Sequence, residues 1–145
     1  MFTVGIDPDS QAHGVAVYDN AKLTQLHNLE LLSLLDMLAL LDKDDLLVSI
    51  ENVCANNFVY ARNASLNKNI HAKVSLSVGR CQQAQVELQR GLDRLDIPYV
   101  LHKPQKGNWA KDKSIFERIT GWDNRSNEDN RSAAYFGFLA IKGRG

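Results

Sequence analysis

Apolar and polar residues alternate along the first part of the chain. This pattern covers residues 2–7, 14–19 and 22–28, which are separated by a short polar segment at 8–13 and a turn at 20–21. A two-residue period is typical of strands with one buried face, and short polar connections join antiparallel neighbours. The chain is therefore predicted to open with a meander of three antiparallel strands.

The middle of the chain has longer apolar patterns. Residues 30–41 are rich in helix formers and predict a buried helix, and the continuous apolar run at 46–50 is typical of a strand covered on both faces. Residues 52–70 are polar and predict a loop with some helix. In residues 74–95 apolar positions recur at steps of three and four, which predicts a long amphipathic helix that ends before Pro98.

The last part completes the order of elements. Residues 98–101 predict a fifth strand, a basic loop follows at 102–113, and residues 114–120 predict a short helix that stops at Gly121. Asn127 is a suitable N-cap for a last helix that runs to about residue 141. The order favours an α/β fold with a five-stranded mixed sheet, three antiparallel strands followed by two parallel ones, and helices on both faces. Since no repeat or linker interrupts the pattern, we expect residues 1–145 to form a single domain.

Charge is distributed unevenly, although the net charge is zero. Residues 1–51 carry nine acidic and two basic side chains, whereas residues 52–145 carry eight acidic and fifteen basic ones. This asymmetry favours an anionic partner for the second part, although a solvated basic face has the same composition.

Targeting signals are absent from the pattern. No apolar run reaches the roughly 18 residues of a membrane span, and the first residues lack the features of a signal peptide. Cys54 and Cys81 are expected to be free thiols of a reducing compartment. We therefore expect no membrane association and a cytoplasmic location, in a host cell if the chain is phage-encoded.

Acidic residues occur where elements end or begin. Asp7 ends the first strand, Glu51 follows the buried strand, and Glu128 and Asp129 begin the last helix. If the first and fourth strands are parallel neighbours, Asp7 and Glu51 end side by side at the edge where α/β folds bind ligands. Two adjacent carboxylates repel unless a cation such as Mg²⁺ neutralises them. A third carboxylate could complete a two-metal site for phosphodiester cleavage.

Each of these acids also has a plainer explanation. Residues 7–10 are suited to a hairpin turn, and Glu51 can be the first exposed residue after a strand. Glu128 and Asp129 complement a helix dipole. Their joint occurrence in this order of elements favours the metal site.

Several stretches resemble the RuvC-type Holliday junction resolvases of the RNase H-like, or retroviral integrase, superfamily. In that family the aspartate after Gly-Ile is a metal ligand and a second carboxylate ends the fourth strand, which maps the two roles onto Asp7 and Glu51. The last motif is similar to that of phage-type members. The matching stretches are VGIDPDS (4–10) with GVA (14–16), SIEN (49–52), the helix and strand at 79–89 and 95–100, the basic loop at 103–113, and 120–122 with 126–134.

The resemblance implies an activity, cofactors and partners. It implies a structure-selective endodeoxyribonuclease, a homodimer that resolves four-way or branched DNA by paired symmetric nicks. Two Mg²⁺ or Mn²⁺ ions in each active site would be held by Asp7, Glu51 and Asp129. The apolar positions of the helix at 74–95 could supply the dimer interface, or they could be used fully against the sheet.

One position departs from the family pattern. There the last helix carries an acid or a histidine and, three residues later, an aspartate; here these positions are Asp129 and Ser132. Ser132 cannot be a charged ligand, so Asp129 with Glu128 has taken over the role, one metal site is weak, or the protein binds branched DNA and cuts it poorly. We favour the takeover, because Asp129 in the first turn lies within a side chain's reach of the same spot.

Basic and aromatic residues are candidates for contacts with DNA. Arg131 could clamp a phosphate or pair with Asp129. Phe58, Tyr60 and Arg62 could stack on unpaired bases or pack against the sheet. The candidates for phosphate neutralisation, which could equally be a solvated loop, are Lys103, Lys106, Lys111 and Lys113. One of these lysines could also stabilise charge developing on the cleaved phosphate.

Two other classes of function remain open. A ribonuclease acting on RNA–DNA hybrids shares the fold and the metals and needs no dimer. A catalytically weak branched-DNA-binding protein is suggested by Ser132 and predicts binding without metal-dependent cleavage. A sugar-kinase-type nucleotide-binding fold also opens with a Gly-Ile-Asp strand, but it needs two similar domains and 145 residues are too few.

Overall fold

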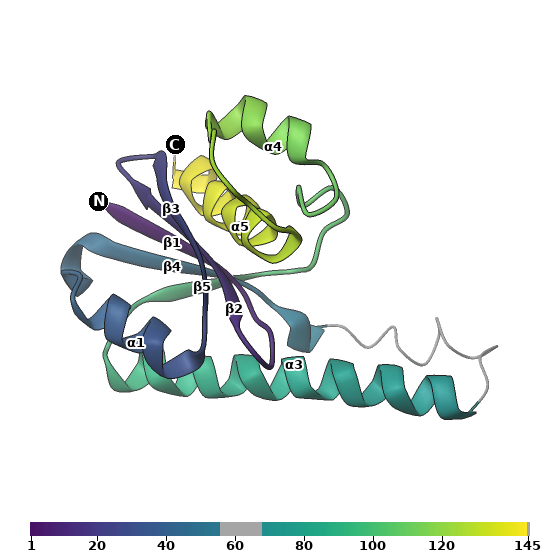
Figure 1. Ribbon diagram of the computed structural model, residues 1–145. Coiled ribbons are helices and arrows are strands. Elements are labelled where there is room, and N and C mark those ends of the chain that lie inside the picture. Colours follow the sequence, from purple (N-terminus) through teal and green to yellow (C-terminus); the bar gives the residue numbers. More distant parts are fainter. Residues whose placement is uncertain (56–67, 145) are drawn as a thin grey trace.

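The computed structural model describes residues 1–55 and 68–144 and is built on a five-stranded sheet in the order β3-β2-β1-β4-β5 (Figure 1). β1 pairs antiparallel with β2 and β2 with β3, while β4 runs parallel to both β1 and β5. The predicted mixed sheet of the RNase H-like fold is confirmed. The strands are β1 (Phe2–Asp7), β2 (His13–Asp19), β3 (Lys22–Leu29), β4 (Leu46–Glu51) and β5 (Tyr99–His102).

Helices cover both faces of the sheet. α1 and α3 lie on one face, and α5 lies on the other with α4 outside it (Figure 1). Within the described residues no helix is long and apolar enough to cross a bilayer. The helices are α1 (Leu31–Ala39), α3 (Lys68–Arg94), α4 (Lys113–Thr120) and α5 (Glu128–Arg144), with short 3-10 turns η1 (Lys43–Asp45) and η2 (Val53–Ala55).

Helix boundaries differ from the sequence predictions where polar residues extend an element. α3 begins at Lys68 rather than at residue 74, and α5 continues to Arg144 rather than ending near residue 141. The added residues at the start of α3 and at the end of α5 include few apolar positions, so they show no helical periodicity of apolar residues. The stop at Gly121 is confirmed, because Gly121 adopts a left-handed conformation with φ of 72° and its N–H bonds to the carbonyl of Glu117.

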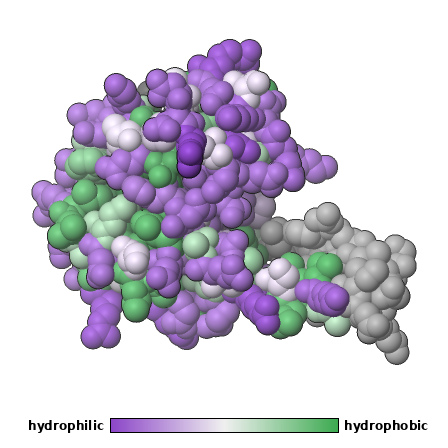
Figure 2. Space-filling model, in the orientation of Figure 1, coloured by the Kyte–Doolittle hydropathy of each residue, from purple (hydrophilic) through white to green (hydrophobic). Residues whose placement is uncertain are grey.

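Each face of the sheet has its own core. Val4, Ile6, Val48 and Ile50 pack with leucines of α1 and α3, while Ala16 and Tyr18 pack with residues of α4 and α5. α5 also contacts β1 and β4, so these two strands are covered on both faces of the sheet. Polar residues cover most of the surface seen in Figure 2, with hydrophobic residues gathered on the side of α1.

α5 lies unusually close to the sheet because glycines face it. A Cβ on Gly5 would collide with the carbonyl of Ala133, and a Cβ on Gly137 would approach the Tyr18 ring at 2.7 Å. The Tyr18 hydroxyl donates a 2.6 Å hydrogen bond to the carbonyl of Ala134. These contacts fix the height of α5 over the ends of β1 and β4, where the candidate acids lie.

Candidate active site

Asp7 and Glu51 end two neighbouring parallel strands. In the β1–β4 register Ile6 lies opposite Ile50, so the next residue of each strand reaches the same edge of the sheet. This arrangement confirms the expectation that the two carboxyl groups end side by side. The carboxyl edge of parallel strands is where ligands bind in α/β folds.

The pair is costly to ionise. Burial, followed by the charges of Glu51, Asp129 and Asp9, raises the pKa of Asp7 from 3.8 to about 8. Burial also raises the pKa of Glu51, and the charge of Asp129 adds to this, while a hydrogen bond with Asp7 lowers it. Burial and the neighbouring charges thus favour a proton on this pair, and a cation that replaced the proton would relieve the repulsion.

Asp129 faces this pair from the first turn of α5. Its charge raises the pKa of both Asp7 and Glu51, and its own pKa is raised by burial and by the charges of Asp9 and Glu128. The turn sits directly over Gly14, where a Cβ would collide with the Asp129 carbonyl. Since Gly14 is the cross-strand partner of Asp7, this contact brings Asp129 beside the strand that carries Asp7.

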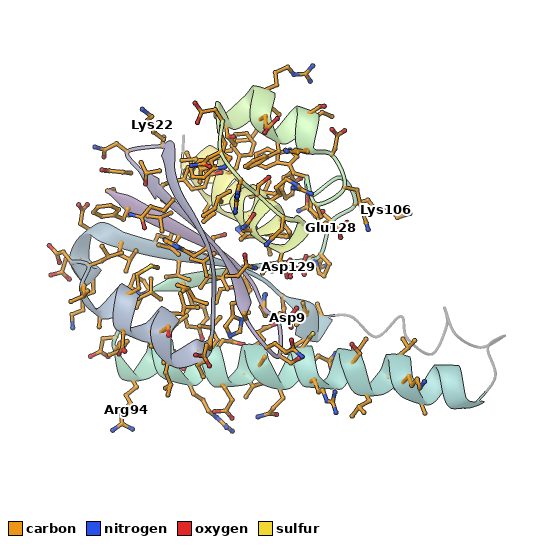
Figure 3. All side chains as sticks on the ribbon, in the orientation of Figure 1. Asp9, Lys22, Arg94, Lys106, Glu128 and Asp129 are labelled. Carbon is orange, nitrogen blue, oxygen red and sulfur yellow. The ribbon has the colours of Figure 1, made fainter. Side chains whose placement is uncertain are left out.

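Glu128 makes a different contact. Its Oε1 lies 3.0 Å from Lys111 Nζ, and both side chains are more than half exposed. In Figure 3 Glu128 lies farther from Asp9 than Asp129 does. Of the two neighbouring acids, Asp129 is therefore the one that acts electrostatically on Asp7 and Glu51.

Ser132 occupies a buried position one turn after Asp129. The residue is 1% exposed, and its hydroxyl makes no hydrogen bond of ordinary geometry within the described residues. The hydroxyl nevertheless faces Asp7 and lowers its pKa by offering a hydrogen bond. A neutral donor thus stands where the family pattern has an aspartate.

The oxygen groups fit a hard divalent cation, although they do not form a closed cage. Within residues 1–55 and 68–144, no three acidic, histidine or cysteine side chains converge closely enough to hold a metal ion by themselves. Mg²⁺ commonly binds one or two carboxylates and completes its shell with water and phosphate oxygens. Asp7 and Glu51 supply such a pair, with the buried Ser132 hydroxyl facing Asp7.

Asp9 and Gln85 also belong to the site, and sequence reasoning gave neither a functional role. Asp9 raises the pKa of Asp7 and Asp129, and its backbone N–H donates to Nδ1 of buried His13 at 3.2 Å. Asp9 lies in the motif quoted for the family, but two residues after Asp7 it also fits a turn. Gln85 lies on the apolar stripe of the long helix. A polar residue at such a position indicates a buried hydrogen-bonding role, and this feature of the sequence could have identified Gln85.

Gln85 holds the chain where it leaves β4. The side chain is 1% exposed; it accepts from Cys54 N at 3.2 Å and donates to Asn52 Oδ1 at 2.9 Å. Asn52 N in turn donates to the carbonyl of His102 at 2.7 Å. These bonds fix the backbone directly after Glu51 between α3 and β5.

The predicted basic loop is anchored on α5. Trp109 is 5% exposed and packs against Phe116, Tyr135 and Phe138. Tyr135 Oη donates to Gln105 Oε1 at 2.9 Å. Lys103, Lys106, Lys111 and Lys113 are exposed on this loop and at the start of α4.

Arg131 also anchors the loop. Its guanidinium donates to the carbonyl of Ala110 at 2.9 Å and to Ser126 Oγ at 2.9 Å. Among the ion pairs between described residues, none joins Arg131 to Asp129. A phosphate contact by Arg131 stays a prediction, and the predicted contacts of Phe58, Tyr60 and Arg62 lie outside the described residues.

Comparison with known proteins assigns the fold. No protein-family model matches the chain, and no curated protein matches it significantly by sequence. Among solved structures, T. thermophilus RuvC in complex with a Holliday junction substrate aligns with a TM-score of 0.65 and 15% identity, covering 99% of this chain and 95% of that one. A second Thermus thermophilus RuvC structure aligns with a TM-score of 0.61 and 16% identity, covering 99% and 97%. The chain therefore has the RuvC-like variant of the RNase H fold.

Proposed function

We propose that the protein is a metal-dependent, structure-selective endodeoxyribonuclease that resolves four-way or branched DNA by paired symmetric nicks. The observation that carries this proposal is the half-buried Asp7–Glu51 pair at the carboxyl edge of the sheet, with Asp129 facing it. The RuvC-like fold supports the choice of substrate, because one matching structure contains a Holliday junction.

Asp7 and Glu51 would hold Mg²⁺ or Mn²⁺, with Asp129 as the third acid and two ions in each site. When bound, such ions activate a water molecule and stabilise the leaving 3′ oxygen. The side chains would orient the ions and exclude bulk water from the buried end of the pair. Asp129, rather than Glu128, takes the role assigned to the last helix, because its charge acts on both partners.

The loop that carries Lys103, Lys106, Lys111 and Lys113 would bind the DNA backbone. Its lysines are exposed, while Trp109 and Arg131 hold the loop against α5. A loop anchored in this way presents its charges with little ordering on binding, which favours affinity. Lys111 must leave Glu128 to reach a phosphate, so Lys103 and Lys106 are the stronger candidates.

Paired symmetric nicks need two active sites, so we propose a homodimer. On α3, Leu88 and Leu92 are fully buried in the core, whereas Val74 and Val78 are half-buried and Leu76 is 55% exposed. The most exposed large apolar side chain of α3, Leu76, lies in the N-terminal half of the helix, which is the part we propose for contact with a second copy.

The test is cleavage of a labelled synthetic four-way junction in Mg²⁺ or Mn²⁺, alongside a linear duplex and an RNA–DNA hybrid. Wild type is compared with Asp7→Asn and with a matched control, Asp19→Asn, which removes an exposed acid at the other end of the sheet. We expect symmetric nicks in the junction for wild type and Asp19→Asn, and none for Asp7→Asn.

Other outcomes would change the assignment. Cleavage of the hybrid alone would identify a ribonuclease instead. Tight junction binding without metal-dependent cleavage would identify a branched-DNA-binding protein, the class suggested by the neutral Ser132.

A further inference from the structure

We propose that Asn28 is a positioning residue that holds Asp129 toward Asp7 and Glu51. Asn28, Asn127 and Asn130 form a hydrogen-bonded group, the asparagine clamp, that joins β3 to the first turn of α5. This inference rests on the proposed function, because it concerns the third acid of the proposed metal site.

A row of residues across the sheet places the clamp. Asn28 pairs with Gly14 in the β2–β3 register, and Gly14 pairs with Asp7 in the β1–β2 register. Cross-strand partners point to the same face of a sheet, so Asn28 and Asp7 flank the bare backbone of Gly14. The backbone of Asp129 rests on Gly14, between these two side chains.

The first turn of α5 is capped reciprocally. Asn127 Oδ1 accepts from Asn130 N at 2.9 Å, and Asn130 Oδ1 accepts from Asn127 N at 2.8 Å. This capping box, with asparagine at both positions, confirms the prediction of Asn127 as the N-cap. Both side-chain oxygens accept bonds within the cap, and the Nδ2 group of each amide donates outside the helix.

Asn28 receives both of these amide groups. Its Oδ1 accepts from Asn127 Nδ2 at 2.8 Å and from Asn130 Nδ2 at 3.1 Å. Asn130 is 6% exposed, so losing its acceptor would leave a buried donor unpaired. Asn28 acts only as an acceptor here, which means that aspartate can replace it and an apolar residue cannot.

The clamp holds Asn127 and Asn130, which lie two residues before and one residue after Asp129. A helix frays most easily in its first turn, where the backbone N–H groups have no partners within the helix. Bonds from Asn127 and Asn130 to the sheet hold that turn in place and set the rotation of α5 about its axis. The Asp129 carboxylate, lying between them in sequence, is thereby kept over the Asp7–Glu51 pair.

The test measures Mn²⁺ affinity by calorimetry, at a temperature where every variant is folded, and hydrogen exchange of the Asn130 and Arg131 amides. Asn28→Leu removes the acceptor, whereas Asn28→Asp keeps it. Gln25→Leu is the matched control, because Gln25 lies on the same strand and bonds to His27 rather than to α5. Leu34→Val, in the core on the other face of the sheet, controls for lost stability alone.

We expect Asn28→Leu to bind Mn²⁺ about tenfold more weakly and to exchange the two amides faster. Asn28→Asp should keep slow exchange and near-normal affinity, and both control variants should bind Mn²⁺ as wild type does. If Asn28→Leu does not fold, Asn127→Ser serves instead, since serine keeps the cap but has no amide to give to Asn28.

The two proposals fail in different ways. Wild-type affinity in Asn28→Leu, or equally weak binding in Leu34→Val, would overturn the positioning role alone. A wild-type protein that binds no Mn²⁺ at all would overturn the proposed metal site, and the positioning role with it.

Discussion

Asp7 and Glu51 share a small space at the ends of two parallel strands, and burial makes it costly to ionise both. Burial and the neighbouring charges raise the pKa of both groups, so a proton on the pair relieves part of this cost. The proton and a divalent cation would then compete for the same oxygens, so stability, pH and metal binding are linked at this one residue.

Stability of the metal-free protein should fall as pH rises through the pKa of Asp7. The folded-state pKa of about 8 lies above the ordinary 3.8, so between these values the folded state binds more protons and loses stability with rising pH. Burial lowers the pKa of His13 and His102, so these histidines change their protonation, and thereby the stability, below about pH 6.5. From about pH 6.5 to about pH 8 we expect a loss of about 1–2 kcal/mol.

Urea unfolding in EDTA measures this dependence, with Asp7→Asn as its control. The amide cannot ionise, so the variant should lose the decline and be more stable than wild type near pH 8. An equal decline in both proteins would show that another group is responsible. Added Mn²⁺ should stabilise wild type and leave Asp7→Asn nearly unchanged.

Replacing Ser132 by aspartate should lower the stability of the protein without metal and strengthen its binding of metal ions. A further carboxylate buried beside Asp7 has no cation to pair with, so we expect a loss of about 1–3 kcal/mol without metal. Mn²⁺ should then raise the melting temperature more than it does in wild type. Ser132→Asn, of similar size but neutral, is the control, and an equal response to Mn²⁺ in the two variants would contradict the prediction.

At the scale of elements, the docking of α5 on the sheet decides the site. Gly5, Gly14 and Gly137 remove side chains along the contact, and hydroxyls of Tyr18 and Ser49 bond to carbonyls of α5 at 2.6 and 2.7 Å. The helix therefore sits at one height and one rotation over β1 and β2. Its first turn reaches the carboxyl edge of β1, and this places Asp129.

Gly14→Ala should disturb this docking. The added methyl would collide with the backbone of Asp129, which cannot move without shifting the helix, so we expect a loss of about 1–3 kcal/mol and of most cleavage. Gly79→Ala is the matched control, because a Cβ at Gly79 meets nothing within 4 Å and alanine in an exposed helix stabilises by about 0.5–1 kcal/mol. Urea unfolding and junction cleavage check both variants, and unchanged cleavage by Gly14→Ala would contradict the role given to the contact.

At the scale of the whole molecule, charge is separated along the chain and in space. Asp7 and Glu51 lie at the ends of β1 and β4, and Lys106 lies near the end of α5 that carries Glu128 and Asp129 (Figure 3). The anionic DNA backbone, once bound to the lysines, can approach the acidic site only if cations neutralise the acids there. Substitutions of the lysines should therefore change the affinity for DNA, whereas substitutions of the acids or removal of their cations should change the cleavage rate.

Lys106→Ala should weaken junction binding uniformly and reduce the salt dependence of the dissociation constant by about one ion. Lys22→Ala is its control, since Lys22 lies at the far side of the molecule from Asp129 and Lys106 (Figure 3). Fluorescence anisotropy over a series of salt concentrations, in Ca²⁺ to prevent cleavage, compares the two. Equal salt slopes for Lys106→Ala, Lys22→Ala and wild type would exclude Lys106 from the DNA interface.

The sequence by itself determined the elements, their order and the class of fold. The alternation at 2–7 and 14–19, the apolar run at 46–50 and the periodicity of 74–95 are local patterns that burial imposes on neighbouring residues. The same patterns predicted that Asp7 and Glu51 end side by side if the first and fourth strands are parallel neighbours, and the structure pairs those strands in parallel.

Only the tertiary structure decided which way the remaining polar side chains point. Glu128 turns to Lys111, Arg131 turns to the carbonyl of Ala110, and Asn127 reaches Asn28. These partners lie 17, 21 and 99 residues away along the chain, so no local pattern contains them. The direction of a polar side chain depends on the donors and acceptors that folding brings near, whereas apolar periodicity depends only on which face is covered.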